Sequence, residues 1–182
     1  KELNSRGADI LKEIPGVLPL SIDKFKELRR NGAVVIDLRD VKSYNNSHIP
    51  SSLSLGVSPQ FVVWASWMLD NETPIIFLAE KLSDVEPASR ALIQVGIDKA
   101  TGYLEGGINA WINSGEKTSK IELTPVAKLK EMLDSGEALN IYDVRAKTEW
   151  SSGHISNSIN MPLNTLTADI KNIKDKSKPI AV

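Results

Sequence analysis

Two stretches of this chain decide its fold: VVIDLRDVKSYNNSHIPSSLSL, residues 34–55, and NIYDVRAKTEWSSGHISNSINM, residues 140–161. They align without a gap at an offset of 106 positions, from residue 34 to residue 140. The matched pairs include Asp37 with Asp143, Arg39 with Arg145, Tyr44 with Trp150, and His48 with His154. Matching over this length at one spacing indicates an internal repeat at the scale of a domain.

The residues ahead of the first stretch carry the signals of a helix followed by a strand. Ser21 is a predicted N-cap, and the helix that follows has apolar residues at Ile22, Phe25 and Leu28 and ends at Gly32. A buried strand is then predicted over 33–36. The equivalent residues ahead of the second stretch, TPVAKLKEMLDSG, predict a helix in the same place.

Further strands and helices are predicted after the first stretch. The turn SHIPSSLSL leads into a strand, residues 75–79 form another, and a helix runs from about 87 to 95. KATGYLEGGINAWINSG, residues 99–115, predicts a short strand, a glycine turn, and a helix that buries Ile108, Trp111 and Ile112. Because strands alternate with helices, the expected class is α/β with a parallel sheet covered on both faces.

Composition narrows the class of function. The 182 residues are 41% hydrophobic and 25% charged, and the formal net charge is −1. No summed charge favours nucleic acid or an anionic membrane surface as partner. The apolar stretches are shorter than the ~20 residues of a membrane span, and the opening KELNSRGADILKE has no secretory core. We expect a cytoplasmic protein that binds neither nucleic acid nor membrane.

Cysteine is absent from the chain. This excludes disulfides, thiolate metal sites and any covalent mechanism through a thiolate of this polypeptide. The two histidines, His48 and His154, are too few for a dedicated metal cluster unless carboxylates join them in space. No metal and no cofactor are predicted.

The repeat also divides the chain. The first unit is expected over residues 17–118, and the second begins near Ile121 and extends to Val182 as the N-terminal half of a further domain. The second unit stops at PIAV, where its third strand opens, so the chain itself is expected to be part of a longer or truncated protein.

PQFVVWASWMLD, residues 59–70, is apolar on more than one helical face. One interpretation is a helix buried deep in the core of its own domain. The other is a contact surface for a neighbouring domain or subunit, since exposed apolar patches mark interfaces. Both interpretations stay open at this point.

The paired motifs DLRD…SHIP and DVRAKTEWSSGHI, together with YLEGGINAW, resemble a tandem of rhodanese-like domains over about residues 17–182. More narrowly, LNSRGADIL, the Trp-rich stretch 59–70 and PIIFLAE are similar to the rhodanese pair that follows a metallo-β-lactamase-fold domain in persulfide dioxygenase-like fusion proteins. The resemblance implies a three-layer fold with a central parallel sheet, one complete domain and an incomplete second repeat. It also implies that residues 1–16 are a linker or the tail of an upstream domain.

An active rhodanese carries a cysteine at the end of the strand that corresponds to 75–79, in a loop whose main-chain N–H groups bind a persulfide or an oxyanion. Here the aligned residue is Ala79, and its methyl group cannot accept sulfur. The resemblance therefore implies a catalytically silent first domain with a vestigial loop formed by Ala79, Glu80, Lys81, Leu82, Ser83 and Asp84.

The acidic residues of this loop invite two interpretations. Carboxylates of Glu80, Asp84 and Glu86 are expected to cap the following helix themselves and to repel an anionic ligand. Alternatively, Glu80 or Asp84 is a general base in a reaction other than sulfur transfer, although no histidine, serine partner or metal cluster can be recognised nearby in the sequence. Phosphatases of this fold also use a cysteine at this position, so the missing thiol excludes phosphatase activity by that mechanism as well.

The repeated polar residues are expected to be structural. Asp37 with Arg39, and Asp143 with Arg145, follow strands, where they could serve catalysis or form ion pairs that stabilise the strand end. Because the pair occurs twice, once beside a site with no nucleophile, we favour the ion pairs. We also expect His48 and His154 to pack at turns rather than to bind a metal, and Gly106 and Gly107 to form a tight turn rather than a phosphate loop.

Two functions follow from these residues and the resemblance. The first is a non-catalytic module of a sulfur-handling fusion protein, whose partner is an upstream metallo-β-lactamase-fold domain or another subunit, a second copy included. The expected contact residues are Phe61, Trp64, Trp67 and Met68. The alternative is a thiosulfate or persulfide sulfurtransferase whose cysteine lies one or two residues beyond Val182, because Pro179 aligns with Pro74. The parent protein would then be the enzyme, and this chain alone would not be.

Overall fold

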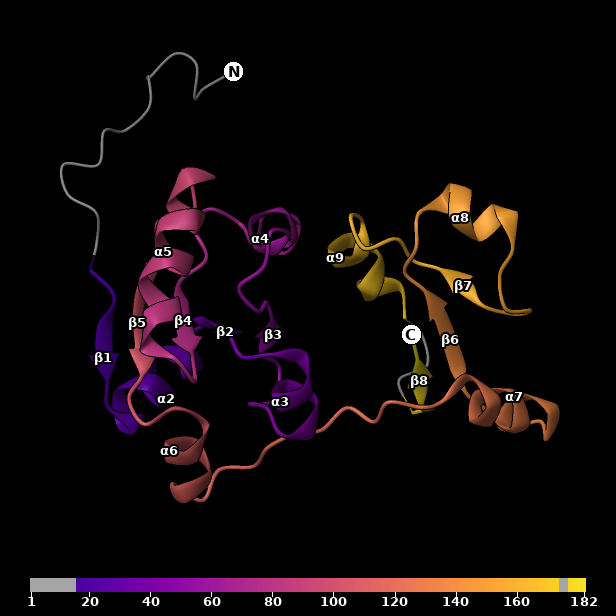
Figure 1. Cartoon of the computed structure of the whole chain (residues 1–182), viewed down its shortest axis with the longest axis horizontal. Helices are drawn as coiled ribbons and strands as arrows, with labels where there is room; N and C mark the ends of the chain where they lie inside the picture. Colours follow the sequence, from indigo (N-terminus) through magenta and orange to yellow (C-terminus); the bar gives the residue numbers. More distant parts are fainter. Residues whose placement is uncertain (1–15, 174–176) are drawn as a thin grey trace, which may run out of the picture.

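The computed structural model describes residues 16–173 and 177–182. The expected upstream tail, residues 1–16, therefore lies almost wholly outside the described residues. Figure 1 shows two units joined by an extended stretch of chain. No helix in the described ranges is long and apolar enough to cross a membrane.

The first unit is built on a five-stranded sheet in which every pairing is parallel. The order across the sheet is β1-β5-β4-β2-β3, so strands distant in sequence are neighbours in space. This confirms the expected α/β class with a central parallel sheet. The strands are β1 Leu18–Leu20, β2 Val34–Asp37, β3 Leu53–Ser54, β4 Ile75–Leu78 and β5 Ala100–Leu104.

Helices cover both faces of this sheet and give three layers. Ile36 and Phe77 point to the face covered by α4 and α5, whereas Val35 and Ile76 point to the face covered by α2 and α6, as the two-residue period of a strand requires. The helical segments are α2 Ile22–Arg30, α3 Val41–Asn46, α4 Phe61–Met68, the 3₁₀ turn η1 Leu82–Asp84, α5 Val85–Gln94 and α6 Gly107–Asn113.

Local sequence explains where these helices begin and end. Ser21 Oγ accepts a hydrogen bond from the Lys24 N–H over 3.3 Å, which confirms the predicted N-cap of α2. Helix α5 begins at Val85, two residues before the predicted start, because Pro87 lies in the first turn, where a main-chain N–H has no helical partner in any case. The prediction that α6 buries Ile112 is wrong: Trp111 is buried, whereas Ile112 is 45% exposed.

The second unit repeats the first half of this arrangement. Its three strands are parallel in the order β7-β6-β8, and the β6–β7 pairing Tyr142 with Ile159 lies 106 positions after the β2–β3 pairing Ile36 with Leu53. Its elements are α7 Val126–Asp134, β6 Asn140–Asp143, α8 Lys147–Ser152, β7 Ile159–Asn160, α9 Leu166–Asp169, η2 Ile170–Asn172 and β8 Ile180–Ala181.

Helix α4 has two distinct faces. Phe61 and Ala65 are 3% and 0% exposed and belong to the core of the first unit, which agrees with the interpretation of a core helix. Val63 and Trp67 are 45% and 40% exposed. Helix α9 of the second unit lies against α4 (Figure 1). Phe61 is too deeply buried to contact a further partner, so a docking role would be left to the exposed face.

Candidate functional site

The loop of residues 79–84, hereafter the Ala79 loop, lies at the carboxyl edge of the sheet, where open α/β folds place their ligand sites. Ala79 follows β4 directly and is 6% exposed. Gly106, the N-cap of α6, and Gly107, its first residue, have φ of +76° and +59°, values that residues other than glycine rarely adopt. A Cβ at Gly107 would lie 3.1 Å from the Ala79 carbonyl oxygen. The glycine turn thus allows α6 to begin directly beside the loop.

The expectation that carboxylates cap this loop is wrong. Neither η1 nor α5 has a side-chain hydrogen bond at its N-cap. The Glu86 carboxylate instead accepts hydrogen bonds from Arg90 Nε and Nη2, one turn along the exposed side of α5. Glu80 is exposed to solvent. An i,i+4 partner for Glu86 and hydration of Glu80 are therefore favoured over capping, and within the described residues no side chain caps the start of η1 or α5.

Two hollows flank the Ala79 loop. The larger, of about 680 Å³, is lined by residues of the Ala79 loop, the glycine turn, α3 and α6. The smaller, of about 220 Å³, is lined by Asp40, Val57, Glu80 and Asp84, among others. Arg39 and Glu80 line both hollows, so the two adjoin at these residues. The sequence placed the Asp37–Arg39 pair beside this site, and the pairing of β2 with β4 is what brings Arg39 to the loop.

Asp37 and Arg39 form a buried ion pair. Arg39 Nε donates to Asp37 Oδ1 over 2.9 Å and Nη2 donates to Oδ2 over 2.7 Å, with side chains 5% and 0% exposed. Arg39 Nη2 also donates to the Ser47 carbonyl over 2.7 Å. The bidentate geometry uses both carboxylate oxygens, so Asp37 is not placed to take a proton from a ligand and Arg39 is largely neutralised.

His48 packs against the stretch of chain between α6 and α7, residues 114–125, hereafter the linker. Its ring stacks on Tyr44 with centroids 4.0 Å apart, and Nδ1 lies 2.9 Å from the Tyr44 carbonyl. The His48 and Ser119 main chains exchange two hydrogen bonds of 2.9 Å. Burial raises the pKa of the Tyr44 phenol, which donates to the Ser52 carbonyl over 2.6 Å. These contacts connect the linker to α3.

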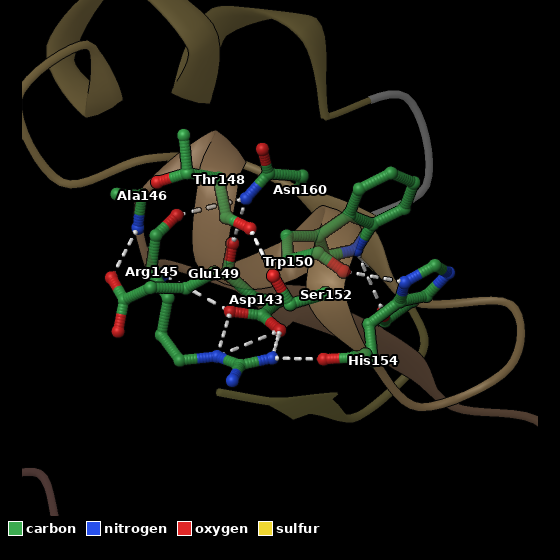
Figure 2. Close-up of polar contacts among 11 residues, drawn as sticks. Asp143, Arg145, Ala146, Thr148, Glu149, Trp150, Ser152, His154 and Asn160 are labelled. Carbon is green, nitrogen blue, oxygen red and sulfur yellow. Dashed lines mark hydrogen bonds and ion pairs between the residues drawn. The ribbon is translucent and has the colours of Figure 1, made fainter.

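The second copy of the motif has the same local geometry (Figure 2). Arg145 Nε donates to Asp143 Oδ1 over 2.9 Å, and Nη2 donates to the Gly153 carbonyl over 2.9 Å. The His154 ring stacks on Trp150 at 3.7 Å, with Nδ1 2.8 Å from the Trp150 carbonyl. The hydrogen bond from Arg145 lowers the pKa of Asp143, and the same bond raises the pKa of Arg145.

The structure thus places the predicted site residues in two groups. Asp37, Arg39 and the Ala79 loop come together at the carboxyl edge of the first sheet, whereas Asp143, Arg145 and His154 form a separate cluster in the second unit. Among the described residues, no three of the types His, Cys, Asp or Glu are grouped so that they could bind a metal ion.

A family model for the rhodanese-like domain matches this chain twice, over residues 21–114 and 125–182. The two matches together cover well over half of the chain. They fall within the two units expected from the repeat.

Solved structures that are similar to this chain include the Alr3790 protein, an anaerobic ergothioneine biosynthesis enzyme and a thiosulfate sulfurtransferase. The Alr3790 protein from Anabaena sp. is 21% identical with a TM-score of 0.50, and the alignment covers 65% of this chain and 94% of that one. An anaerobic ergothioneine biosynthesis enzyme from Chlorobium limicola, solved with trimethyl histidine, is 18% identical with a TM-score of 0.51, over 81% of this chain and 41% of that one.

The third is a thiosulfate sulfurtransferase from Pseudomonas aeruginosa, 18% identical with a TM-score of 0.47, over 85% of this chain and 36% of that one. This chain spans well under half of the length of the two enzymes. For the Anabaena and Chlorobium proteins, at 21% and 18% identity, the likeness is one of fold.

Proposed function

Because the chain belongs to the rhodanese-like domain family, we propose that its first domain is a non-catalytic member that acts as a scaffold or interaction module of a sulfur-handling protein. The observation that carries this proposal is Ala79, which occupies the position after β4 where an active rhodanese has its cysteine. The chain has no cysteine at all, so none elsewhere in it could substitute.

The chemistry of the loop supports this proposal. Sulfur transfer needs a thiolate, because the thiolate is the nucleophile that attacks the donor sulfur. The methyl group of Ala79 has no lone pair to offer, and Arg39 is held by Asp37. The exposed Glu80 carboxylate would also repel thiosulfate as it approached. The site therefore lacks both a nucleophile and an available positive charge that would attract an anionic sulfur donor.

A role as a module of a larger assembly rests on the sequence resemblance to rhodanese pairs behind a metallo-β-lactamase-fold domain, and on α4. The exposed face of α4 carries Val63 and Trp67. Apolar side chains exposed on one helix face are typical of contact surfaces. An upstream domain or another subunit on this face remains part of the proposal.

Sulfur transfer by the purified chain tests the proposal. We expect no transfer from thiosulfate to cyanide above the rate without protein, and no gain of a sulfur atom on the intact chain by mass spectrometry. The variant Ala79→Cys is the matched comparison: it restores a thiolate that can take the outer sulfur of thiosulfate as sulfite leaves, but the exposed Glu80 carboxylate still opposes the anion, so we expect only slow formation of a persulfide. Transfer by the unmodified chain would refute a non-catalytic role.

A second candidate function is favoured by the register of β8. Ile180 pairs with Asn140 as Ile75 pairs with Val34, so β8 takes the place of β4 in the second unit. In a protein that continues past Val182, the residue equivalent to Ala79 would follow shortly after. A cysteine there would make the second domain a sulfurtransferase. Determining the coding sequence downstream of Val182 tests this candidate, and any other residue at that position removes it.

A further inference from the structure

The larger hollow beside the Ala79 loop, hereafter the groove, has aliphatic side chains in its lining. Leu82 and Ile112 are 61% and 45% exposed and line it together with Ile108. Ala79, buried at the end of β4, forms part of the lining. Aliphatic side chains that converge on a hollow of about 680 Å³ provide a pocket large enough for an apolar side chain of a ligand.

Two carboxamides complete this lining. Asn46 ends α3 and Asn109 lies in α6, and both line the larger hollow and are exposed. In the part of the chain that the structure describes, neither carboxamide has a hydrogen-bond partner. A carboxamide offers both donor and acceptor groups, which is what the main chain of an extended peptide requires.

The charge next to this groove is acidic. Asp40, Glu80 and Asp84 line the adjoining smaller hollow, where Lys81 is the cation without an ion pair among the described salt bridges. Arg39 lines the hollow too, but its charge is offset by Asp37 at 2.7 Å. A ligand that reaches from the apolar groove to this hollow thus meets more negative than positive charge, which favours a cationic group.

We propose that these two hollows dock an extended segment of a partner protein that carries an apolar side chain next to a lysine or arginine. The apolar side chain lies over Ala79 between Leu82 and Ile112, and the basic one meets Glu80 and Asp84. This inference rests on the proposed function, because a cysteine and a bound sulfur would otherwise occupy the floor of the groove. The segment docks beside the Ala79 loop at the carboxyl edge of the sheet, and the exposed face of α4 stays available for the domain or subunit of the proposed function.

The chemistry argues against an anionic occupant. A thiosulfate or a phosphate would face the carboxylates of Glu80 and Asp40, and the one guanidinium in reach is already bonded through two nitrogens to Asp37. A purely apolar segment would leave the acidic hollow unmatched. A segment that combines both kinds of side chain satisfies the groove and its rim together.

Three fluorescein-labelled peptides test the proposal against the whole chain by fluorescence anisotropy. The first has the sequence Gly-Leu-Lys-Gly-Leu-Lys-Gly; the second replaces each Lys with Glu, and the third replaces each Leu with Ser. We expect the first to bind at least about 10-fold more tightly than either of the others, the equivalent of about 1.4 kcal/mol. Equal binding of the Lys and Glu peptides overturns the proposed charge complementarity.

Surface variants locate the site without disturbing the core. The double variant Leu82→Ser with Ile112→Ser is expected to lower the affinity for the Leu-Lys peptide about 10-fold, and Glu80→Gln is expected to lower it about 3-fold. The matched controls are Val126→Ser and Glu137→Gln, both exposed residues of the second unit, which should leave binding within about 2-fold. Binding that is insensitive to Leu82 and Ile112 but lost with Trp67→Ser would move the partner to α4 and overturn the proposal.

The two hypotheses fail in different ways. Sulfur transfer is measured on the same preparation that is used for peptide binding. An inactive chain that binds none of the three peptides overturns the docking proposal and leaves the non-catalytic function standing. A chain that transfers sulfur overturns the proposed function, whatever the peptides do.

Discussion

The Asp-Arg-His motif occurs twice in this chain with nearly the same hydrogen bonds and very different surroundings. In each copy, the arginine Nη2 donates both to the aspartate and to the carbonyl eight residues beyond that arginine, at 2.7 Å for Ser47 and 2.9 Å for Gly153. The side chains of Arg39 and Asp37 are 5% and 0% exposed, whereas those of Arg145 and Asp143 are 47% and 13% exposed.

This difference in exposure comes from the strands and helices that surround each ion pair and not from the motif itself. In the first unit β4 separates β2 from β5, and helices cover both faces of the sheet. In the second unit β6 lies between β7 and β8, and the buried apolar residues in its described part are Ile141, Tyr142 and Met161. Short-range sequence thus determines how the motif bonds, and the surrounding layers determine how much free energy those bonds carry.

Removing the arginine is expected to give the largest contrast between the copies. Arg39→Ala would leave the Asp37 carboxylate buried without its partner, and we expect the free energy of unfolding to fall by about 3–5 kcal/mol. Arg145→Ala leaves a carboxylate that water can reach, so we expect only a small change in the urea midpoint. Urea unfolding of both variants, with hydrogen exchange to resolve the two units, measures the contrast. Equal losses would mean that burial does not determine how much the ion pair contributes to the free energy of unfolding.

Equivalent strand residues should give the next largest contrast. Ile75 and Ile180 hold the same register position in β4 and β8, but they are 0% and 50% exposed. Ile75→Ala is expected to cost about 2–5 kcal/mol through lost burial and a cavity. Ile180→Ala should cost less than about 1 kcal/mol. Ile75→Val, which removes one methyl group, is the graded control at about 0.5–1.5 kcal/mol.

The smallest expected contrast between the two copies concerns the N-cap of the helix that follows each Asp-Arg pair. Asp40 caps α3, because its carboxylate accepts the Ser43 N–H over 3.0 Å and the Ser43 hydroxyl over 2.8 Å. The equivalent residue before α8 is Ala146, which has no acceptor. Ala146→Asp should therefore stabilise the second unit by about 1 kcal/mol. The measurement is amide hydrogen exchange, which should become slower in α8 and stay the same in α3. An unchanged exchange rate in α8 would contradict the prediction.

The cap of α3 should also respond to pH. The Ser43 N–H, followed by the Ser43 hydroxyl, lowers the pKa of Asp40 below its ordinary value. A lowered pKa means that the cap contributes stability above the unfolded-state pKa and loses it as the pH falls through the folded-state pKa. Asp40→Asn keeps a cap that does not titrate. The stability of the natural chain relative to this variant should therefore decline in acid, and a constant difference would refute the cap.

Several features of the fold could be predicted from sequence because they depend on local contacts. The alternation of strands and helices, the N-cap at Ser21 and the later strand at 180–181 are all confirmed. Strand β1 was not predicted, because three residues before a helix carry no periodicity and the strand exists only through its pairing with β5.

The site was less predictable. The sequence located the Ala79 loop, but it led to a wrong prediction of carboxylate capping, because it could not show that Glu86 bonds to Arg90. It placed Arg39 beside this loop, but it gave no sign that Gly107 would pack against Ala79. Those residues come from three strand ends that lie far apart along the chain, and only the strand order of the sheet makes them neighbours.

By itself, the sequence determined that the chain repeats, that each copy of the motif bonds within about ten residues of itself, and that no thiolate is available. The tertiary structure alone decided which copy is buried, which residues line the hollows beside Ala79, and which acidic side chains lie next to the groove. The reason is physical: a hydrogen bond between near neighbours follows from spacing, whereas burial depends on every segment that packs above a residue.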